Sequence, residues 1–114
     1  MKTISIKKEI GTTEAILGTF GVQVAKTITQ QLKKHEPIAI SFKGLKNVNI
    51  NFTCSMIQPL YKSFPKKTIE KLVTYQDVTD KFWQSEIEEA ISLATNPKKA
   101  KIIEEVRNKV FWGH

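Results

Sequence analysis

The sequence has few of the residues on which catalytic and metal sites are usually built. It contains one cysteine, Cys54, in 114 residues, which excludes an internal disulfide and a metal site made of several thiolates. Its two histidines, His35 and His114, are far apart in the chain and do not have the short spacing of a ligand pair. We therefore expect no bound metal and no cofactor.

Arginine and long hydrophobic runs are also scarce. Of the 18 basic residues only Arg107 is an arginine, whereas specific recognition of phosphates and bases favours the bidentate guanidinium group. No apolar run approaches the roughly 20 residues that span a bilayer, and the first residues alternate where a signal peptide needs a continuous apolar stretch. We expect a cytoplasmic protein that does not enter a membrane.

What the sequence does contain is typical of one folded domain. Apolar residues make up 40% and charged residues 25% of the chain, which is close to ordinary globular usage. The length suits one hydrophobic core, and no repeat, low-complexity tract or flexible linker divides the chain. We therefore expect a single domain over residues 1–114.

The net charge of +7 is distributed unevenly. Residues 37–69 contain no acid, whereas residues 66–95 carry six acids against four lysines. Two interpretations remain open: a cationic surface that keeps the protein soluble, and a surface that binds nucleic acid. For nucleic acid the candidate residues are in the basic last segment: Lys98, Lys99, Lys101 and Arg107.

Hydrophobic periodicity predicts a chain in which strands and helices alternate. The predicted strands cover residues 3–10, 14–17, 38–42 and 68–75. The predicted helices cover residues 20–34, residues 55–64, a segment capped by Asp77 or Thr79 with Phe82 and Trp83 toward the core, and a last helix from Asn96 onward. Because strand–helix–strand connections produce parallel pairs, we expect an α/β fold with a small mixed, partly parallel sheet of about four strands and four helices packed on it.

Proline and glycine residues bear on where two of these helices begin. Proline is tolerated only near a helix start, so Pro59 predicts that the second helix begins at about Ser55 or has a kinked first turn. Gly18 and Gly21 precede the first helix without the GxGxxG or Lys-Ser/Thr residues of a phosphate-binding loop. A turn with close packing explains them.

Residues suited to catalysis have structural explanations. A helix N-terminus can lower the pKa of a thiol such as that of Cys54, but no partner base is visible, and a lone cysteine among apolar neighbours is usually a small buried hydrophobe. Glu86, Glu88 and Glu89 are explained equally well by a solvated helix face. We expect a protein that is not an enzyme.

The loop between the strand at 38–42 and the second helix is the strongest candidate site. In an α/β sheet the crevice at the carboxyl ends of the strands is the usual recognition surface, and a helix N-terminus there offers unpaired N–H groups. Five polar side chains crowd this place: Asn47, Asn49, Asn51, Thr53 and Ser55. Either they form a binding surface together with Gly44, or one of them caps the helix while the others line a turn.

This loop also carries a family resemblance. ISFKGLKNVNINF, residues 40–52, resembles the strand and switch loop of STAS domains, the sulfate-transporter and anti-sigma-factor-antagonist modules, and is more similar still to the bacterial STAS-like group. That group's pattern is apolar-x-apolar-Asp-Phe-x-Gly-Val-x-x-Ile-Ser-x-Ser-Phe, in which Gly44, Val48 and Phe52 are in register. The resemblance is best over residues 37–95. It implies a STAS-like regulatory or scaffold module that binds a protein partner, such as a histidine-kinase-like ATPase or a transcription regulator.

The resemblance further implies a phosphorylation switch at the junction of loop and helix, where an added charge of about −2 breaks the partner interface. By position the family's hydroxyl sites fall on Asn49, Ile50 and Asn51, none of which accepts a phosphate. The family's strand aspartate falls on Ser41. We therefore expect a phospho-acceptor, if one exists, to be displaced to Thr53 or Ser55.

Overall fold

The computed structural model describes residues 2–96. The elements follow one another in the order β1 (Lys2–Ser5), α1 (Ile6–Ile10), β2 (Glu14–Ala15), α2 (Gly18–Leu32), β3 (Ile38–Ser41), β4 (Asn47–Val48), α3 (Ile50–Ser63), α4 (Lys66–Leu72), β5 (Val73–Gln76) and α5 (Lys81–Thr95). None of the helices within these residues has the length and apolar character needed to cross a bilayer.

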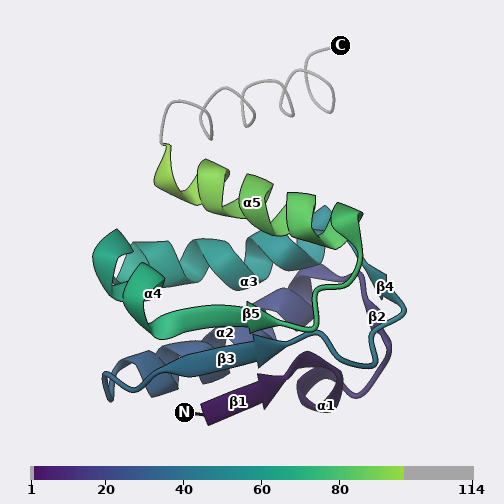
Figure 1. Cartoon of the computed structure of the whole chain (residues 1–114), viewed down its shortest axis with the longest axis horizontal. Coiled ribbons are helices and arrows are strands. Elements are labelled where there is room, and N and C mark those ends of the chain that lie inside the picture. The colour runs from purple at the N-terminus through teal and green to yellow at the C-terminus, as the bar shows by residue number, and fades with distance from the viewer. Residues whose placement is uncertain (1, 97–114) are drawn as a thin grey trace.

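The strands form two parallel sheets. β3 lies between β1 and β5 in the larger sheet, and β2 pairs with β4 in a two-residue ladder. The strands of the larger sheet run in one direction and α2, α3 and α5 run back (Figure 1). The C-terminal ends of the strands therefore meet the N-termini of these helices at one end of the molecule, which we call the carboxyl end. The opposite end is the amino end.

The α/β class and the parallel pairing agree with the prediction, but the strand count does not. The described residues form sheets of three and two strands, with five helices, in place of one sheet of about four strands with four helices. The last predicted helix lies outside the described residues, except that Asn96 follows the end of α5.

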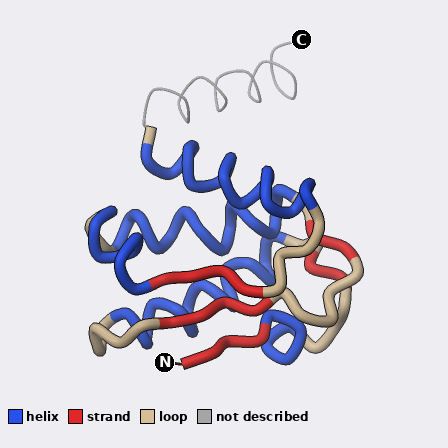
Figure 2. Tube along the Cα trace, viewed as in Figure 1, coloured by secondary structure: helices blue, strands red, loops and turns tan. Residues whose placement is uncertain are grey.

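One face of the larger sheet is apolar because side chains alternate along each strand. The side chains on this face are buried: Ile4, Ile38, Ile40 and Val73. α2 and α3 cover it, as the blue helices behind the red strands show (Figure 2). The opposite face carries the exposed residues Thr3, Thr74 and Gln76.

The first predicted strand is wrong beyond Ser5, because the chain turns there into the short helix α1. Ser5 Oγ accepts a hydrogen bond from the backbone N–H of Lys8 at 3.3 Å, and Gly11 ends the helix with a φ of 73°. A serine at the start and a glycine after the end are the usual boundary signals of a helix. They outweigh the alternation of isoleucines that suggested a strand.

The strand predicted over residues 68–75 is also partly wrong. Residues 66–72 form α4, and only Val73–Gln76 form β5. Ile69 and Leu72 are both buried and are three residues apart, which is the spacing of one helix face. The apolar run therefore divides between a helix and a strand.

α3 begins at Ile50, well before Ser55, and it continues through Pro59. Both predictions for this proline are therefore wrong, since Pro59 lies neither near the helix start nor in its first turn. Proline leaves the carbonyl of Ser55 without its helical donor. Burial holds the helix together on both sides of that position, through Phe52, Thr53, Met56, Ile57 and Leu60.

Two further corrections concern α5 and α2. The cap of α5 is Asp80, whose Oδ1 accepts from the backbone N–H of Phe82 at 2.8 Å, and not Asp77 or Thr79. Gly18 and Gly21 lie within α2 and not in a turn before it. The close packing expected of them is confirmed for Gly21, where an added Cβ would lie 2.8 Å from Ser55 Cβ on α3.

Candidate functional site

Asn49 fixes the loop between β3 and α3 to the chain that enters α2. Its Oδ1 accepts from the backbone N–H of Phe52 at 3.0 Å, which caps α3. Its Nδ2 donates to the carbonyl of Ile16 at 2.8 Å. Both the oxygen and the nitrogen of the amide are therefore hydrogen-bonded, which favours the capping interpretation for Asn49.

The other polar residues of the loop divide into outward and inward groups. Gly44, Asn47 and Asn51 are exposed, and Asn47 Nδ2 donates to Glu14 Oε2 across the small ladder. Thr53 is completely buried, and Ser55 is half-buried between α3 and α2. The structure thus brings three of the six predicted partner-binding residues to the surface.

Thr53 is poorly placed to accept a phosphate. Its Oγ1 donates to the carbonyl of Asn49 at 3.0 Å inside the first turn of α3, so a kinase could reach it only after that turn opened. Ser55 Oγ lies 3.1 Å from the position that a Cβ on Gly18 would take, and a phosphate would have to fit between two helices. Phosphorylation at Ser55 stays a prediction.

Large apolar side chains are exposed at the carboxyl end, where the loop also lies. Among the described residues the large hydrophobic side chains that remain exposed are Ile16, Leu17, Val22 and Phe82. Ile16 and Leu17 directly precede α2, and Phe82 is in the first turn of α5. Phe82 was predicted to face the core, but 79% of its surface is exposed. Trp83, the next residue, packs beside Phe42 instead.

A basic pocket of about 740 Å³ opens beside the ends of β1 and β3. Three lysines line it, Lys7, Lys8 and Lys43, together with serine, threonine and glycine residues. Lys7 lies across Gly44, since an added Cβ there would be 2.9 Å from Lys7 Cδ. This part of the carboxyl end therefore suits a partner that presents carboxylates or phosphates.

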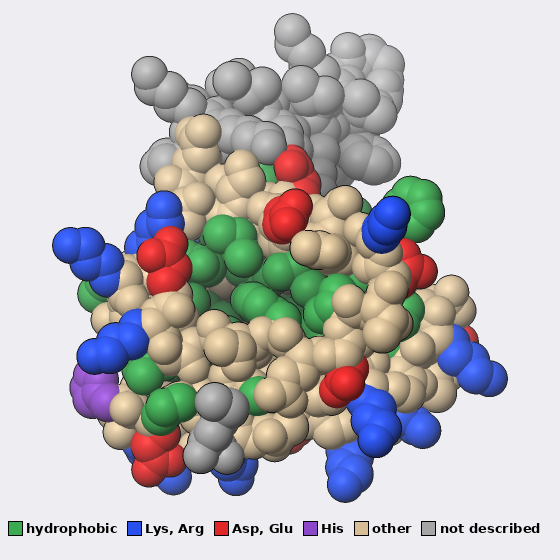
Figure 3. Space-filling model, viewed as in Figure 1, with side chains coloured by type: hydrophobic (Ala, Val, Ile, Leu, Met, Phe, Trp, Pro, Cys, Tyr) green, Lys and Arg blue, Asp and Glu red, His purple; other side chains and the backbone are tan. Residues whose placement is uncertain are grey.

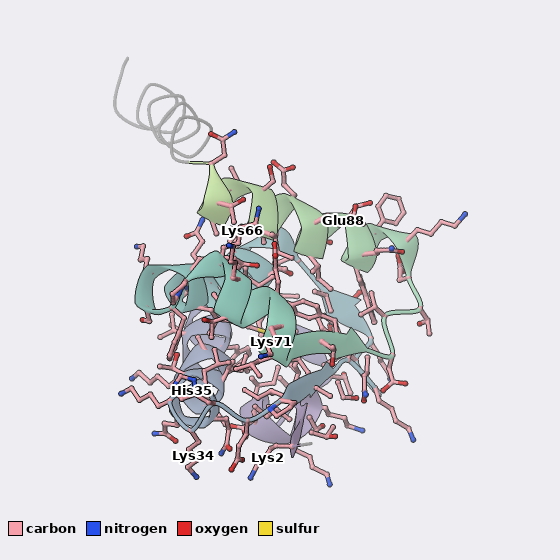
Figure 4. All side chains as sticks on the ribbon, turned by 60° about the vertical axis from the view of Figure 1, so that its left-hand side comes forward. Lys2, Lys34, His35, Lys66, Lys71 and Glu88 are labelled. Atoms are coloured by element: carbon pink, nitrogen blue, oxygen red, sulfur yellow. The ribbon has the colours of Figure 1, made fainter. Side chains whose placement is uncertain are left out.

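A second basic surface gathers at the amino end. The first rung of the sheet aligns Lys2, Ile38 and Val73, so the segments that precede β3 and β5 meet there. Its basic residues are exposed: Lys2, Lys33, Lys34, His35, Lys66, Lys67 and Lys71. Figure 4 shows Lys2, Lys34, His35, Lys66 and Lys71 on one side of the molecule. Glu70 lies among them and pairs with Lys66, with Nζ and Oε1 3.7 Å apart.

Potential metal ligands are not clustered in the part of the chain that the structure describes. The described residues hold no set of three His, Cys, Asp or Glu side chains that could bind a metal ion. Cys54 is half-buried and packs against the core, and His35 occupies the turn after α2 with a φ of 57°. His114 lies outside the described residues.

The acidic residues of α5 differ in exposure. Glu88 is exposed as predicted for a solvated face, whereas Glu86 and Glu89 are half-buried. Burial raises the pKa of Glu86, and the nearby charge of Asp80 raises it further.

The exposure of Ile16 and Leu17 was not predicted, because both fell inside the strand expected over residues 14–17. In the structure β2 ends at Ala15 and α2 begins at Gly18, so the two side chains lie in the short connection between them. The predicted nucleic-acid-binding residues, Lys98, Lys99, Lys101 and Arg107, lie outside the described residues.

No protein-family model, no curated protein and no solved structure matches this chain.

Proposed function

We propose that this chain is a non-catalytic regulatory or scaffold module that binds a protein partner through the carboxyl end of its sheet. The observation that carries the proposal is that three large apolar side chains, Ile16, Leu17 and Phe82, are exposed at the carboxyl end, where the loop with Gly44 and Asn51 also lies. Exposed large side chains leave apolar area in water that a partner would cover. Protein interfaces combine such an apolar centre with a polar rim.

The resemblance of residues 40–52 to STAS-like domains supports the same surface and supplies a class of partner. In that family the loop and helix start contact a protein such as a histidine-kinase-like ATPase or a transcription regulator. The lysines of the adjacent pocket, Lys7, Lys8 and Lys43, favour a partner with an acidic face. Complementary charge would speed its association and fix its orientation.

Co-purification from the native cell, followed by calorimetry with the purified partner, tests the proposal. We expect Asn51→Arg and Leu17→Asp each to weaken binding at least tenfold, which is about 1.4 kcal/mol. Leu17 is the N-cap residue of α2, so an aspartate there also supplies a good cap and keeps the helix start intact.

Gln30→Arg is the matched control, because Gln30 is exposed on α2 and lies toward the amino end. Like Asn51→Arg, it replaces a side-chain amide by a guanidinium group and adds one positive charge. A partner whose affinity is indifferent to Asn51→Arg and Leu17→Asp, or that loses as much affinity on Gln30→Arg, contradicts the proposed surface.

The alternative function is nucleic-acid binding, and the lysines of the amino end favour it. These cations also have a structural explanation, since Lys33 and Lys34 follow the C-terminus of α2, where positive charge is stabilising. Fluorescence anisotropy with a labelled oligonucleotide separates the two. Binding through phosphates weakens steeply with salt, and the absence of binding at low salt excludes the alternative.

Two sets of substitutions locate such binding. We expect neutralising Lys33 and Lys34 to reduce the slope of log binding constant against log salt concentration. Lys26→Ala, at an exposed position in the middle of α2, should leave that slope unchanged. A slope that responds instead to Lys98→Ala and Lys101→Ala would place the binding in the last segment of the chain.

A further inference from the structure

A groove of about 520 Å³ separates the edge strand β5 from helix α5. Tyr75 and Val78 line it from the strand side, and Ile87 and Ile91 line it from the helix. In Figure 3 apolar side chains gather in a hollow across this face of the molecule, with acidic side chains at its border. The groove therefore combines an apolar floor with a charged rim.

The wall formed by β5 is an open edge of the sheet. Among the described strands β5 pairs only with β3, and Phe42 N–H donates to the carbonyl of Gln76 at 3.0 Å. The backbone N–H and C=O groups of successive residues point to opposite sides of a strand. Those of Thr74 and Gln76 therefore point to β3, and those of Tyr75 point to the groove. An extended chain could pair with them.

The opposite wall is a helix that extends past the sheet. α5 packs on α3, and in Figure 1 the place of a further strand beside β5 lies in front of α3 and below α5. Adjacent strands lie about 4.8 Å apart. A strand added at that distance would turn alternate side chains toward Ile87 and Ile91.

Charge indicates what kind of chain fits. Residues 73–96 contain five acids and one lysine, although the whole protein has a net charge of +7. Asp77 and Glu88 line the groove itself. A second copy that paired through its own β5 would bring these acids against their equivalents, whereas a segment with lysine or arginine would complement them.

We propose that this groove binds an extended, basic segment of a partner protein, which adds to the sheet as a strand beside β5. Its apolar side chains alternate with lysine or arginine, and its backbone pairs with that of Tyr75. Edge strands beside a helix bind peptides in this manner, with affinity from the main chain and specificity from the side-chain pockets. The groove shares no lining residue with the loop surface around Gly44 and Asn51, so either proposal can fail without the other.

The test titrates the isotope-labelled full chain with a short capped peptide that alternates valine with lysine. We expect amide shifts confined to residues 73–77 and 84–91, and hydrogen exchange at Tyr75 slowed at least tenfold. The control peptide has the same sequence with alternate amides N-methylated, which keeps its charge and side chains but prevents ladder hydrogen bonds. We expect it to bind at least tenfold more weakly.

Two variants with the same change of charge separate the groove from general attraction. We expect Glu88→Lys to weaken the valine–lysine peptide at least fivefold, and Glu36→Lys, at an exposed position of the amino end, to weaken it less than twofold. Equal effects of the two variants, or equal binding of the N-methylated peptide, overturn the proposal. So do groove amides that are already protected in the free protein and do not respond to peptide, because a second copy or the chain itself would then occupy the groove.

Discussion

The hydroxyl of Ser41 donates a 2.8 Å hydrogen bond to the carboxylate of Asp77 and so joins the end of the central strand to the turn after β5. Ser41 Oγ also accepts from the backbone N–H of Lys43 at 3.2 Å. Ser41 is the position at which the STAS-like pattern has an aspartate. In this protein the carboxylate at the end of β3 comes from Asp77, in the turn that follows β5.

We expect Ser41→Ala to lower the free energy of unfolding by about 1–3 kcal/mol, because Ser41 is buried and its hydrogen bond has a charged acceptor. Asp77→Asn keeps an acceptor and tolerates the φ of 60° at this position, so its effect should be smaller. Urea denaturation of Ser41→Ala, of Asp77→Ala and of the double variant that combines them gives the coupling energy. A coupling energy near zero would show that the bond adds no stability.

Gly21→Ala should destabilise the protein by about 1–3 kcal/mol through overpacking. An added Cβ would lie 2.9 Å from the backbone nitrogen of Met56 on α3, which is backbone and cannot easily move. Alanine is intrinsically the better helix former by about 1 kcal/mol, so a loss of stability isolates the close contact. Thr19→Ala, at an exposed position of the same helix, is the control and should change stability by less than about 0.5 kcal/mol. A stabilised Gly21→Ala protein would mean that α2 and α3 do not approach so closely.

Pro59→Ala should raise the free energy of unfolding by about 1–3 kcal/mol. A proline in the interior of a helix removes one hydrogen bond and clashes with the preceding turn, at a cost of about 3 kcal/mol, and alanine restores the donor for the carbonyl of Ser55. Thermal and urea denaturation would measure the gain against Lys62→Ala, an exposed position in the last turn of α3. Unchanged or lower stability would indicate that the Pro59 ring contributes packing that offsets its cost.

The sequence predicts elements well where burial on one face is strong. α2 and β3 appear close to their expected bounds, because Val24, Ile28 and Leu32 repeat at helical spacing and the apolar run of β3 directly follows Pro37. Its errors occur where short local signals compete with an apolar pattern. α1 is a short helix whose boundary residues, Ser5 and Gly11, compete with alternating isoleucines in the sequence. α4 is also short, and no side-chain cap marks its start.

The candidate loop shows a different limit of the sequence. Its position at the carboxyl end follows from the order of strands and helices, which was predictable. Which side chains point outward was not predicted, because Asn51 and Thr53 both counted as polar loop residues, yet α3 turns Thr53 inward and Asn51 to solvent. The exposure of Phe82 depends likewise on where α5 begins, and that was set by Asp80.

The hydroxyl of Tyr75 gives a prediction of pH dependence. Its oxygen is buried, with no hydrogen-bond partner among the described residues. Burial raises the pKa of Tyr75 well above its usual value of about 10, and the nearby Tyr61 raises it further. In the unfolded chain the same group titrates near pH 10. Above that pH the unfolded state therefore loses a proton that the folded state keeps, and the stability of the wild-type protein falls as pH rises.

Tyr75→Phe removes this titration while it keeps the ring against Phe42, whose centroid lies 6.5 Å away. At pH 8 we expect the variant to be at least as stable as the wild type, because a buried hydroxyl without a partner contributes a desolvation penalty. Between pH 8 and pH 11 the urea midpoint of the variant should fall less than that of the wild type. Lysine deprotonation affects both proteins alike, so the difference between the two curves isolates Tyr75. Parallel curves would mean that the Tyr75 hydroxyl ionises as easily in the folded state as in the unfolded chain, and that the floor of the groove is open to water.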